Sequence, residues 1–210
     1  MDKRLSAAKK EIDPTKEYEP EEAVALAQKT ATTKFVGNVE VHVRLGIDPK
    51  KTEQTVRATI TLPHGSGKTK KIAVFAGNEG DELIKKIKET GQVDFDIAIA
   101  EPAIMPKLAQ IAKILGPKGL MPNPKSGTVT ADIEKALKEY ASGKTEFKND
   151  DSGNVHMTIG KTSFDVSQLT ENFKAFLDAL RAAKPAEIKK EFIQSMTIHS
   201  TMGPAIKIKI

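Results

Sequence analysis

Hydrophobic and polar residues alternate in two stretches of the first third of the chain, over 38–47 and over 55–62. Successive side chains of a strand point to opposite faces, so each stretch predicts a half-buried strand. A turn at Asp48-Pro49 separates them, and we expect the two strands to form a hairpin. Ahead of them, apolar residues at helical spacing from Pro20 to about Thr33 predict a helix that begins with proline and two acids.

The middle of the chain has a different pattern. Continuous apolar runs at 71–76 and 95–100 predict strands that are covered on both faces. Helices are expected at 82–89, 105–115 and 131–141. Strands that alternate with helices imply a parallel sheet with crossover helices, which is an α/β architecture.

The alternating pattern returns after a turn-rich stretch at 150–154. The predicted elements there are a strand over 155–159, a helix over 167–183 and closing strands over 192–199 and 205–210. Because the two ends of the chain share one pattern, we predict a discontinuous domain of residues 1–65 and 155–210. An α/β domain of residues 66–154 is inserted into it, and the crossings at 63–67 and 150–154 would allow the domains to move.

Composition narrows the function only slightly. The 210 residues include 33 basic and 28 acidic side chains, which gives a net charge of +5. This excess favours a polyanionic partner such as nucleic acid only a little, since a balanced surface gives the same total. There are no cysteines, so disulfides and cysteine-bound zinc are excluded and a reducing cytoplasm suits the chain. No apolar run is long enough to predict a membrane helix.

The fragment Gly65-Ser66-Gly67-Lys68-Thr69 is similar to the end of a phosphate-binding loop. The full motif needs a glycine where this chain has Leu62, and the glycines come before the next strand, not after one. A turn between domains is therefore favoured over nucleotide binding. No catalytic residue and no cofactor are predicted, although catalytic groups can also be assembled from distant segments.

The four histidines are His42, His64, His156 and His199, and no two of them have a metal-binding spacing. Three of them fall on predicted strands of the same domain. We therefore expect histidines on the polar face of a sheet and no metal site.

The segment from Leu115 to Thr128 holds three prolines and three glycines, so it is predicted to be an extended loop after a helix. Lys118 and Lys125 could contact phosphates there, with glycine N–H groups facing the anion. A rigid connector explains the composition equally well, and the residues alone leave both interpretations open.

A second group of polar and aromatic residues comes from the outer parts of the chain. Its segments are Lys34-Phe35, Gly160 to Phe164 and Ser200 to Pro204. If the two ends form one domain, these loops could converge into a surface suited to the 2′-OH and phosphate groups of RNA. The alternative is that Phe35 belongs to the core and the last segment is only a hairpin turn.

One stretch closely resembles the signature of a known family. It reads Ile114-Leu115-Gly116-Pro117-Lys118-Gly119-Leu120-Met121-Pro122-Asn123-Pro124-Lys125-Ser126-Gly127-Thr128-Val129. The family is that of the first protein of the large ribosomal subunit, which builds the mobile stalk beside the tRNA exit site. Further matches lie at 39–42, 45–49, 62–65, 147–150 and 201–204, so the resemblance covers nearly the whole chain.

The resemblance implies an α+β domain from both chain ends that binds rRNA, and an inserted Rossmann-like domain with three layers. It implies a cytoplasmic protein, present as a monomer in the ribosome, that contacts tRNA leaving the exit site. It also implies that the chain represses translation of its own messenger. The residues at positions that match the family's rRNA site are Lys34, Phe35, Asn38, Glu40, Gly160, Lys161, Ser163, Thr201, Met202 and Gly203.

The chain departs from the family pattern in two places. Only Gly77 to Gly80 stands where the family usually has a further helix and strand, so we expect an abbreviated inserted domain. Asn38 stands where threonine is frequent. A free-standing RNA-binding repressor and, less favoured, a nucleotide-using enzyme are the competing interpretations.

Overall fold

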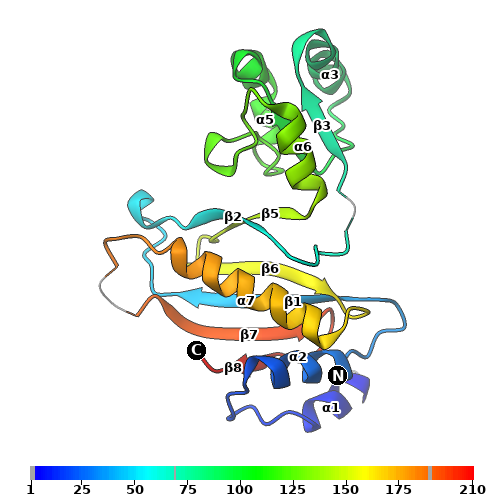
Figure 1. Ribbon diagram of the computed structural model, residues 1–210, viewed down its shortest axis with the longest axis vertical. Helices are drawn as coiled ribbons and strands as arrows, with labels where there is room; N and C mark the ends of the chain where they lie inside the picture. Colours follow the sequence, from blue (N-terminus) through cyan, green and yellow to red (C-terminus); the bar gives the residue numbers. More distant parts are fainter. Residues whose placement is uncertain (1–2, 69, 189–190) are drawn as a thin grey trace. The chain divides into compact units, whose positions relative to one another are not determined.

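The computed structural model describes residues 3–68, 70–188 and 191–210 (Figure 1). The chain divides into two compact units, which we name the split unit (Met1–Gly67 with Gly143–Ile210) and the inserted unit (Lys68–Ser142). Helices and strands occur in both, which confirms the α/β class. Among the described residues, no helix combines the length and the apolar composition that crossing a bilayer requires.

A four-stranded antiparallel sheet in the order β6-β1-β7-β8 forms the centre of the split unit. Its strands are β1 (Asn38–Leu45), β6 (Asn154–Lys161), β7 (Ile193–Ser200) and β8 (Ile206–Ile208). An early strand therefore pairs with two late ones (Figure 1). Val39, Val41 and Val43 are fully buried, whereas His42 and Arg44 face the other side, so the half-buried strand predicted here is confirmed.

Helices α2 (Pro20–Lys29) and α7 (Val166–Ala182) pack on each other and on this sheet, and α1 (Lys3–Lys10) precedes them. The side of the sheet that these helices occupy, including the helices themselves, is called the covered face below. The opposite side of the sheet is called the open face. Asp165 caps α7 together with Gln168, whose side chain accepts a hydrogen bond of 3.2 Å from the Asp165 N–H. The buried apolar residues of α7 recur every three or four positions and fill the core between this helix and the sheet. They are Leu169, Phe173, Phe176 and Leu180.

The predicted hairpin is wrong. Strand β2 (Arg57–Thr61) pairs with β5 (Lys144–Lys148), and the short helix η1 (Thr52–Gln54) separates it from β1. The β2–β5 ribbon belongs to the split unit because Phe147 packs against Phe176, with ring centroids 5.5 Å apart. The chain therefore returns to the split unit at Gly143, earlier than the crossing predicted at 150–154, and that stretch is the turn between β5 and β6.

The inserted unit contains two parallel strands, β3 (Ile72–Phe75) and β4 (Ile97–Ala100), joined by helix α3 (Gly77–Thr90). On one side Phe75, Ala98 and Ala100 pack with α3 and the helical segment that follows β4. On the other side Ile97 and Ile99 pack with α6 (Ile133–Ala141). This gives the predicted three layers around a small sheet.

The helix predicted over 105–115 is interrupted. It consists of η2 (Pro102–Ile104), α4 (Met105–Leu108), η3 (Ala109–Ile111) and α5 (Ala112–Leu115). The apolar spacing survives the interruption, since Leu108, Ile111 and Leu115 are fully buried.

The proline- and glycine-rich segment leaves α5 at Gly116 and contains one turn of helix, η4 (Pro124–Ser126). Its polar groups bond to one another: the Thr128 hydroxyl accepts from the Asn123 N–H at 2.8 Å, and the Tyr140 hydroxyl donates to the Ser126 carbonyl at 2.8 Å. Val129 then forms a parallel bridge to Ala100 beside β4. These bonds support the interpretation of the segment as a rigid connector.

Candidate RNA-binding site

Strand register brings three distant segments to one end of the sheet in the split unit. Asn38 at the start of β1 pairs with Lys161 at the end of β6, and Val39 pairs with Ser200 at the end of β7. We name this region, with the loops 33–37, 162–165 and 201–205, the loop end. The predicted site residues that lie there are Lys34, Phe35, Asn38, Gly160, Lys161, Ser163, Thr201, Met202 and Gly203.

Hydrogen bonds fix these segments to one another. The Thr201 hydroxyl accepts from the Asn38 N–H at 2.9 Å and donates to the Asn38 carbonyl at 3.2 Å, while the Thr201 N–H donates to the same carbonyl at 2.8 Å. The Thr162 N–H donates to the Gly37 carbonyl at 2.9 Å. The loop end is therefore arranged by the protein itself, before any partner binds.

Large apolar side chains are exposed at the loop end. The exposed fractions are 61% for Phe35, 59% for Val36 and 72% for Met202. The alternative in which Phe35 belongs to the core is thus wrong. Exposed apolar groups that are clustered and held in place indicate a binding surface, because they gain contacts only when a partner covers them.

The turn that carries Met202 is strained. Met202 has a φ of 66°, a left-handed conformation that costs a residue with a side chain about 1–3 kcal/mol. The turn closes through the Gly203 N–H, which donates to the Ser200 carbonyl at 2.7 Å. A Cβ on Gly203 would lie 2.4 Å from Ser200 Oγ, so any larger residue would force the Ser200 side chain to move. The exposed methionine is held in a conformation that it would not adopt freely.

Four of the predicted contact residues differ from the exposed loop residues. Gly160 is buried, and a Cβ there would lie 2.6 Å from Leu169 Cδ2. The glycine therefore allows β6 to pack closely against α7. Glu40 is half-buried on the open face, opposite His199 of β7. Lys118 is exposed in the inserted unit, and the side chain of Lys125 lies outside the described part of the structure.

Sequence reasoning missed several residues. Val36 joins the loop end, where it is 59% exposed. His42, His156 and His199 meet on the open face. Only the pairing of β1 with β6 and β7 brings these histidines together, so no local spacing could have shown it.

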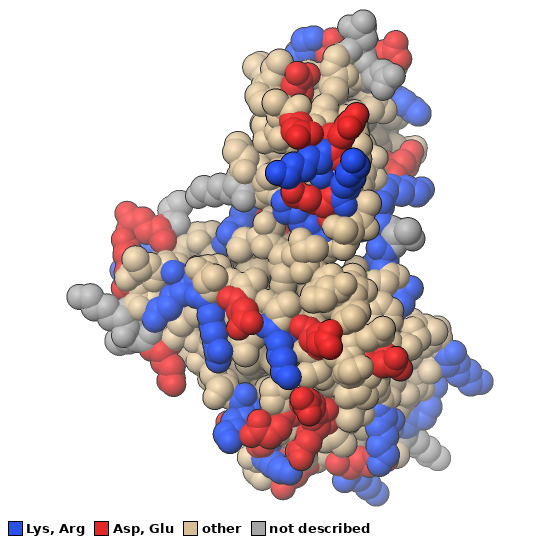
Figure 2. Space-filling model, viewed as in Figure 1, with Lys and Arg blue, Asp and Glu red and all other residues tan. Residues whose placement is uncertain are grey.

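Charges on the covered face are balanced. Figure 2 shows basic and acidic side chains interspersed over α2 and α7. Lys174 lies 3.5 Å from Glu21, and Lys209 lies 3.1 Å from Glu19, oxygen to nitrogen. Paired charges of both signs create little field, so this face is a poor match for a phosphate backbone.

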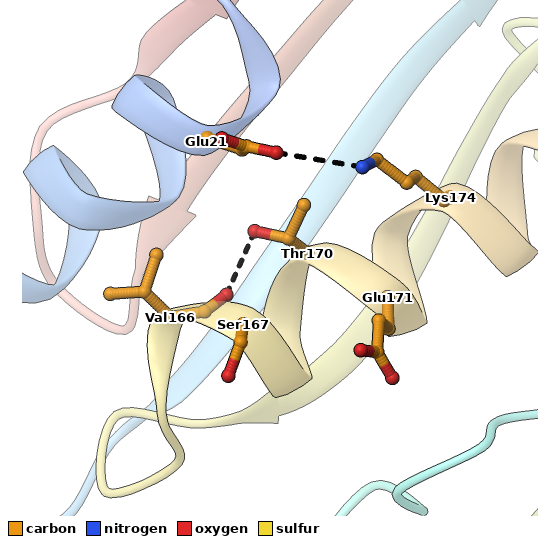
Figure 3. Close-up of a pocket in the computed structure, with 6 residues that line it drawn as sticks. All are labelled: Glu21, Val166, Ser167, Thr170, Glu171 and Lys174. Carbon is orange, nitrogen blue, oxygen red and sulfur yellow. Dashed lines mark hydrogen bonds and ion pairs between the residues drawn. The ribbon is translucent and has the colours of Figure 1, made fainter.

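A shallow pocket lies between α2 and the first turns of α7 (Figure 3). Three of its polar side chains have partners within the protein, since Lys174 pairs with Glu21 and the Thr170 hydroxyl donates to the Val166 carbonyl at 2.8 Å. We assign no ligand to this pocket.

The fragment similar to a phosphate-binding loop is a turn. Buried Asn172 of α7 accepts from the His64 N–H at 3.1 Å and donates to the Gly65 carbonyl at 3.0 Å. Gly65 and Gly67 both have left-handed φ values, 64° and 70°. Thr69 lies outside the described residues. The contacts of Asn172 hold this stretch against α7 and agree with the predicted interdomain turn.

Comparison with known proteins shows the family of the chain. Residues 27–204 match the model of the ribosomal protein L1p/L10e family. A protein of Chloroflexus aurantiacus named large ribosomal subunit protein uL1 is 46% identical over 222 residues, which cover 98% of this chain and 94% of the relative. Proteins of the same name from Mycoplasma capricolum and Mesoplasma florum are each 44% identical and cover 100% of the chain and 98% of their own length.

These matches define the class first: the chain is a ribosomal protein and not an enzyme, which removes the nucleotide-using alternative. More specifically, the chain belongs to the ribosomal protein L1p/L10e family.

Proposed function

We propose that the chain is a structural constituent of the large ribosomal subunit and binds its rRNA through the loop end of the split unit. The observation that carries the proposal is the fixed exposure of Phe35 and Met202 beside the hydrogen-bonded Asn38–Thr201 pair. Relatives named large ribosomal subunit protein support the same partner.

The proposed contact is recognition of RNA shape. An RNA helix offers a wide, shallow minor groove lined with 2′-hydroxyls, and unstacked bases offer flat faces. Phe35 and Met202 would pack on ribose or base faces, while Ser163 and backbone groups bond to hydroxyls. Lys34 and Lys161 would contact phosphates, which makes the affinity fall as salt rises.

The main test is titration of large-subunit rRNA with the full chain. Phe35→Ala and Met202→Ala are expected to lose at least about tenfold in affinity, as residues that carry a large share of an interface do. Ile210→Ala is the matched control, because Ile210 is also apolar and 54% exposed but lies outside the loop end. Equal affinities for all variants, with circular dichroism unchanged, would remove the loop end from the interface.

Co-sedimentation with large subunits separates a ribosomal constituent from a free-standing repressor. A constituent stays with subunits that lack their own copy of this protein and sediments with them after washing. A free-standing repressor binds its messenger but remains in the supernatant.

The same surface is proposed to repress translation of the chain's own messenger by binding a structure that imitates the rRNA site. In cell-free translation of that messenger, added chain should reduce synthesis, and added rRNA fragment should restore it by competition. Met202→Ala should weaken repression and rRNA binding in parallel. Repression that survives this change would place messenger binding elsewhere.

The inserted unit is proposed to contact tRNA leaving the ribosome, with exposed Lys118 as one phosphate contact. Lys118→Ala should weaken crosslinking of exit-site tRNA to the chain on assembled ribosomes while rRNA affinity stays unchanged. Lys113→Ala is a control, since Lys113 is also an exposed lysine of this unit but lies before the proline- and glycine-rich segment.

A further inference from the structure

Three histidines and one glutamate lie side by side on the open face of the sheet in the split unit. His42 is on the central strand β1, directly opposite His156 on β6, and Glu40 is opposite His199 on β7. The ring centroids of His42 and His199 are 4.6 Å apart with an angle of 21° between the ring planes, and the His156 ring meets His42 edge-on at 4.8 Å. No function described above uses the three imidazoles.

The position of the ring proton on His199 and on His156 follows from a neighbouring oxygen that can only accept a hydrogen bond. His199 Nδ1 lies 2.9 Å from the Ser200 carbonyl, so that nitrogen carries the proton and the Nε2 lone pair points at His42. His156 Nε2 lies 3.3 Å from an oxygen of Asp150, so its proton is there and the Nδ1 lone pair points at His42.

His42 cannot satisfy both neighbours as a neutral ring. Its Nδ1 is 2.6 Å from His156 Nδ1 and its Nε2 is 2.5 Å from His199 Nε2, but neutral imidazole has only one N–H. If the proton serves His156, two nitrogen lone pairs face each other across the contact between His42 and His199. That contact needs a cation between the two nitrogens, which is either a second proton or a metal ion.

We propose that Glu40, His42 and His199 bind a divalent transition-metal ion, with Zn²⁺ as the best match. Their nitrogen and oxygen ligand atoms all lie within 4.8 Å of one another. Two imidazoles and one carboxylate form a known three-residue zinc set that leaves a fourth position for water. The ion takes the place of the missing proton between His42 and His199.

The surrounding groups support this assignment. Metal-binding histidines usually donate their other N–H to a carbonyl or carboxylate, which fixes the ring. His199 does so to the Ser200 carbonyl, whereas the other nitrogen of His42 meets a ring nitrogen of His156, which in turn contacts Asp150.

The geometry requires one adjustment. Two nitrogens bound to one tetrahedral ion at about 2.0–2.1 Å from it lie about 3.3 Å apart. The two Nε2 atoms must therefore separate from their present 2.5 Å. Both rings are half-buried on the open face, so small rotations of the two side chains are enough to separate the nitrogens.

The experiment is titration of the full chain with Co²⁺, without RNA, followed by competition with Zn²⁺. We expect a visible absorption band of tetrahedral Co²⁺ that saturates at a single equivalent and disappears when Zn²⁺ is added. His42→Ala and His199→Ala should abolish the band, and Glu40→Gln should weaken it. His64→Ala is the control, because His64 pairs with Glu171 away from the open face and should leave binding unchanged.

His156→Ala is a variant of a positioning residue, since the ligands remain but the bond that orients His42 is lost. We expect it to bind Co²⁺ about 10–100-fold more weakly. Nitrogen NMR of the unaltered chain adds a measurement that no folding defect can disturb. On addition of Zn²⁺, the Nε2 signals of His42 and His199 should shift and those of His64 should not.

Absence of a saturable band, equal binding by His42→Ala and the unaltered chain, or unshifted Nε2 signals would overturn the metal site. Because no RNA is used, each of these results leaves the proposed rRNA function untouched. A failure of the rRNA titration would likewise leave the metal site standing.

Discussion

The loop end and the covered face belong to the same sheet, yet they follow opposite physical rules. On the covered face, Val41 and Phe176 are fully buried and exposed charges such as Lys174 and Glu21 pair with each other. At the loop end, Phe35 and Met202 are exposed and Met202 has a left-handed backbone. The covered face holds the unit together, whereas the loop end combines exposed apolar side chains with a strained backbone and therefore costs stability.

The largest expected effect lies under the covered face. Phe176→Ala removes a fully buried ring that packs on Phe147, and we expect it to lower the free energy of unfolding by about 3–5 kcal/mol. Urea denaturation measures the change. At a temperature where the variant is folded, its affinity for rRNA should equal that of the unaltered chain. A loss below about 1 kcal/mol would show that the covered face does not dominate stability.

The next effect tests whether the loop end is fixed by its own hydrogen bonds. Thr201→Val keeps the shape but leaves the Asn38 N–H without its partner, at an expected cost of about 1–3 kcal/mol in unfolding free energy and weaker rRNA binding. Thr170→Val is the matched control, because that hydroxyl only donates to a carbonyl of its own helix. Equal costs for the two variants would contradict the special role of the Asn38–Thr201 pair.

Met202→Gly should move stability and binding in opposite directions. Glycine adopts the left-handed conformation freely, so the free energy of unfolding should hold or rise by up to about 1 kcal/mol. Affinity for rRNA should fall at least about tenfold with the loss of the side chain. Met202→Ala keeps the strain and should lose affinity without gaining stability. A Met202→Gly chain that is less stable but binds rRNA with unchanged affinity would show that Met202 contributes to stability and not to binding.

A smaller effect is expected at the turn of residues 150–153, between β5 and β6, which has no exposed apolar cluster and is built from polar bonds. Burial alone would raise the pKa of Asp150, but hydrogen bonds from the Asn154 backbone, the Asn154 side chain, Ser152 and His156 together lower it to about 2. The folded pKa is depressed, so the stabilisation is present above about pH 4 and is lost as the pH falls through about 2.

Asp150→Asn tests this contribution through urea denaturation at pH 7 and near pH 2. The stability difference from the unaltered chain should be below about 1 kcal/mol at pH 7, since the carboxylate is partly exposed, and should shrink in acid. A difference that is independent of pH would show that charge on Asp150 is not the cause.

The smallest effect is expected at the surface of the covered face. Lys174→Ala breaks an exposed ion pair with Glu21 and should change stability by less than about 1 kcal/mol. Affinity for rRNA should stay the same. A tenfold loss of affinity would move the RNA contact to the covered face and end the distinction between the two regions.

Local patterns predicted the elements of this chain well but not their partners. The alternation over 38–47 predicted β1, and the apolar spacing over 167–183 predicted α7. A strand with one buried face has an apolar residue at every second position, and a helix has one at every third or fourth position. Nothing local says which strand pairs with which. The hairpin was therefore predicted wrongly, and β5 was missed because its alternation is too short to stand out.

The candidate site was predictable to a similar degree. The family resemblance supplied Thr201, Met202 and Gly203, and their positions at the loop end follow from the sheet register. The exposure of Phe35 did not follow from the sequence, since an aromatic residue after a helix suits a core equally well. The histidine cluster needed the pairing of three strands, each distant in sequence from the others.

The split unit also has a consequence for the order of events during protein synthesis. Strand β1 leaves the ribosome early, but its neighbours β6 and β7 and the turn with Met202 are made long afterwards. The inserted unit is one continuous segment and can fold as it emerges, whereas β1 waits for distant partners. The loop end therefore comes into existence only when residues 201–205 have been translated, so a prematurely terminated chain lacks the surface that we propose for rRNA binding.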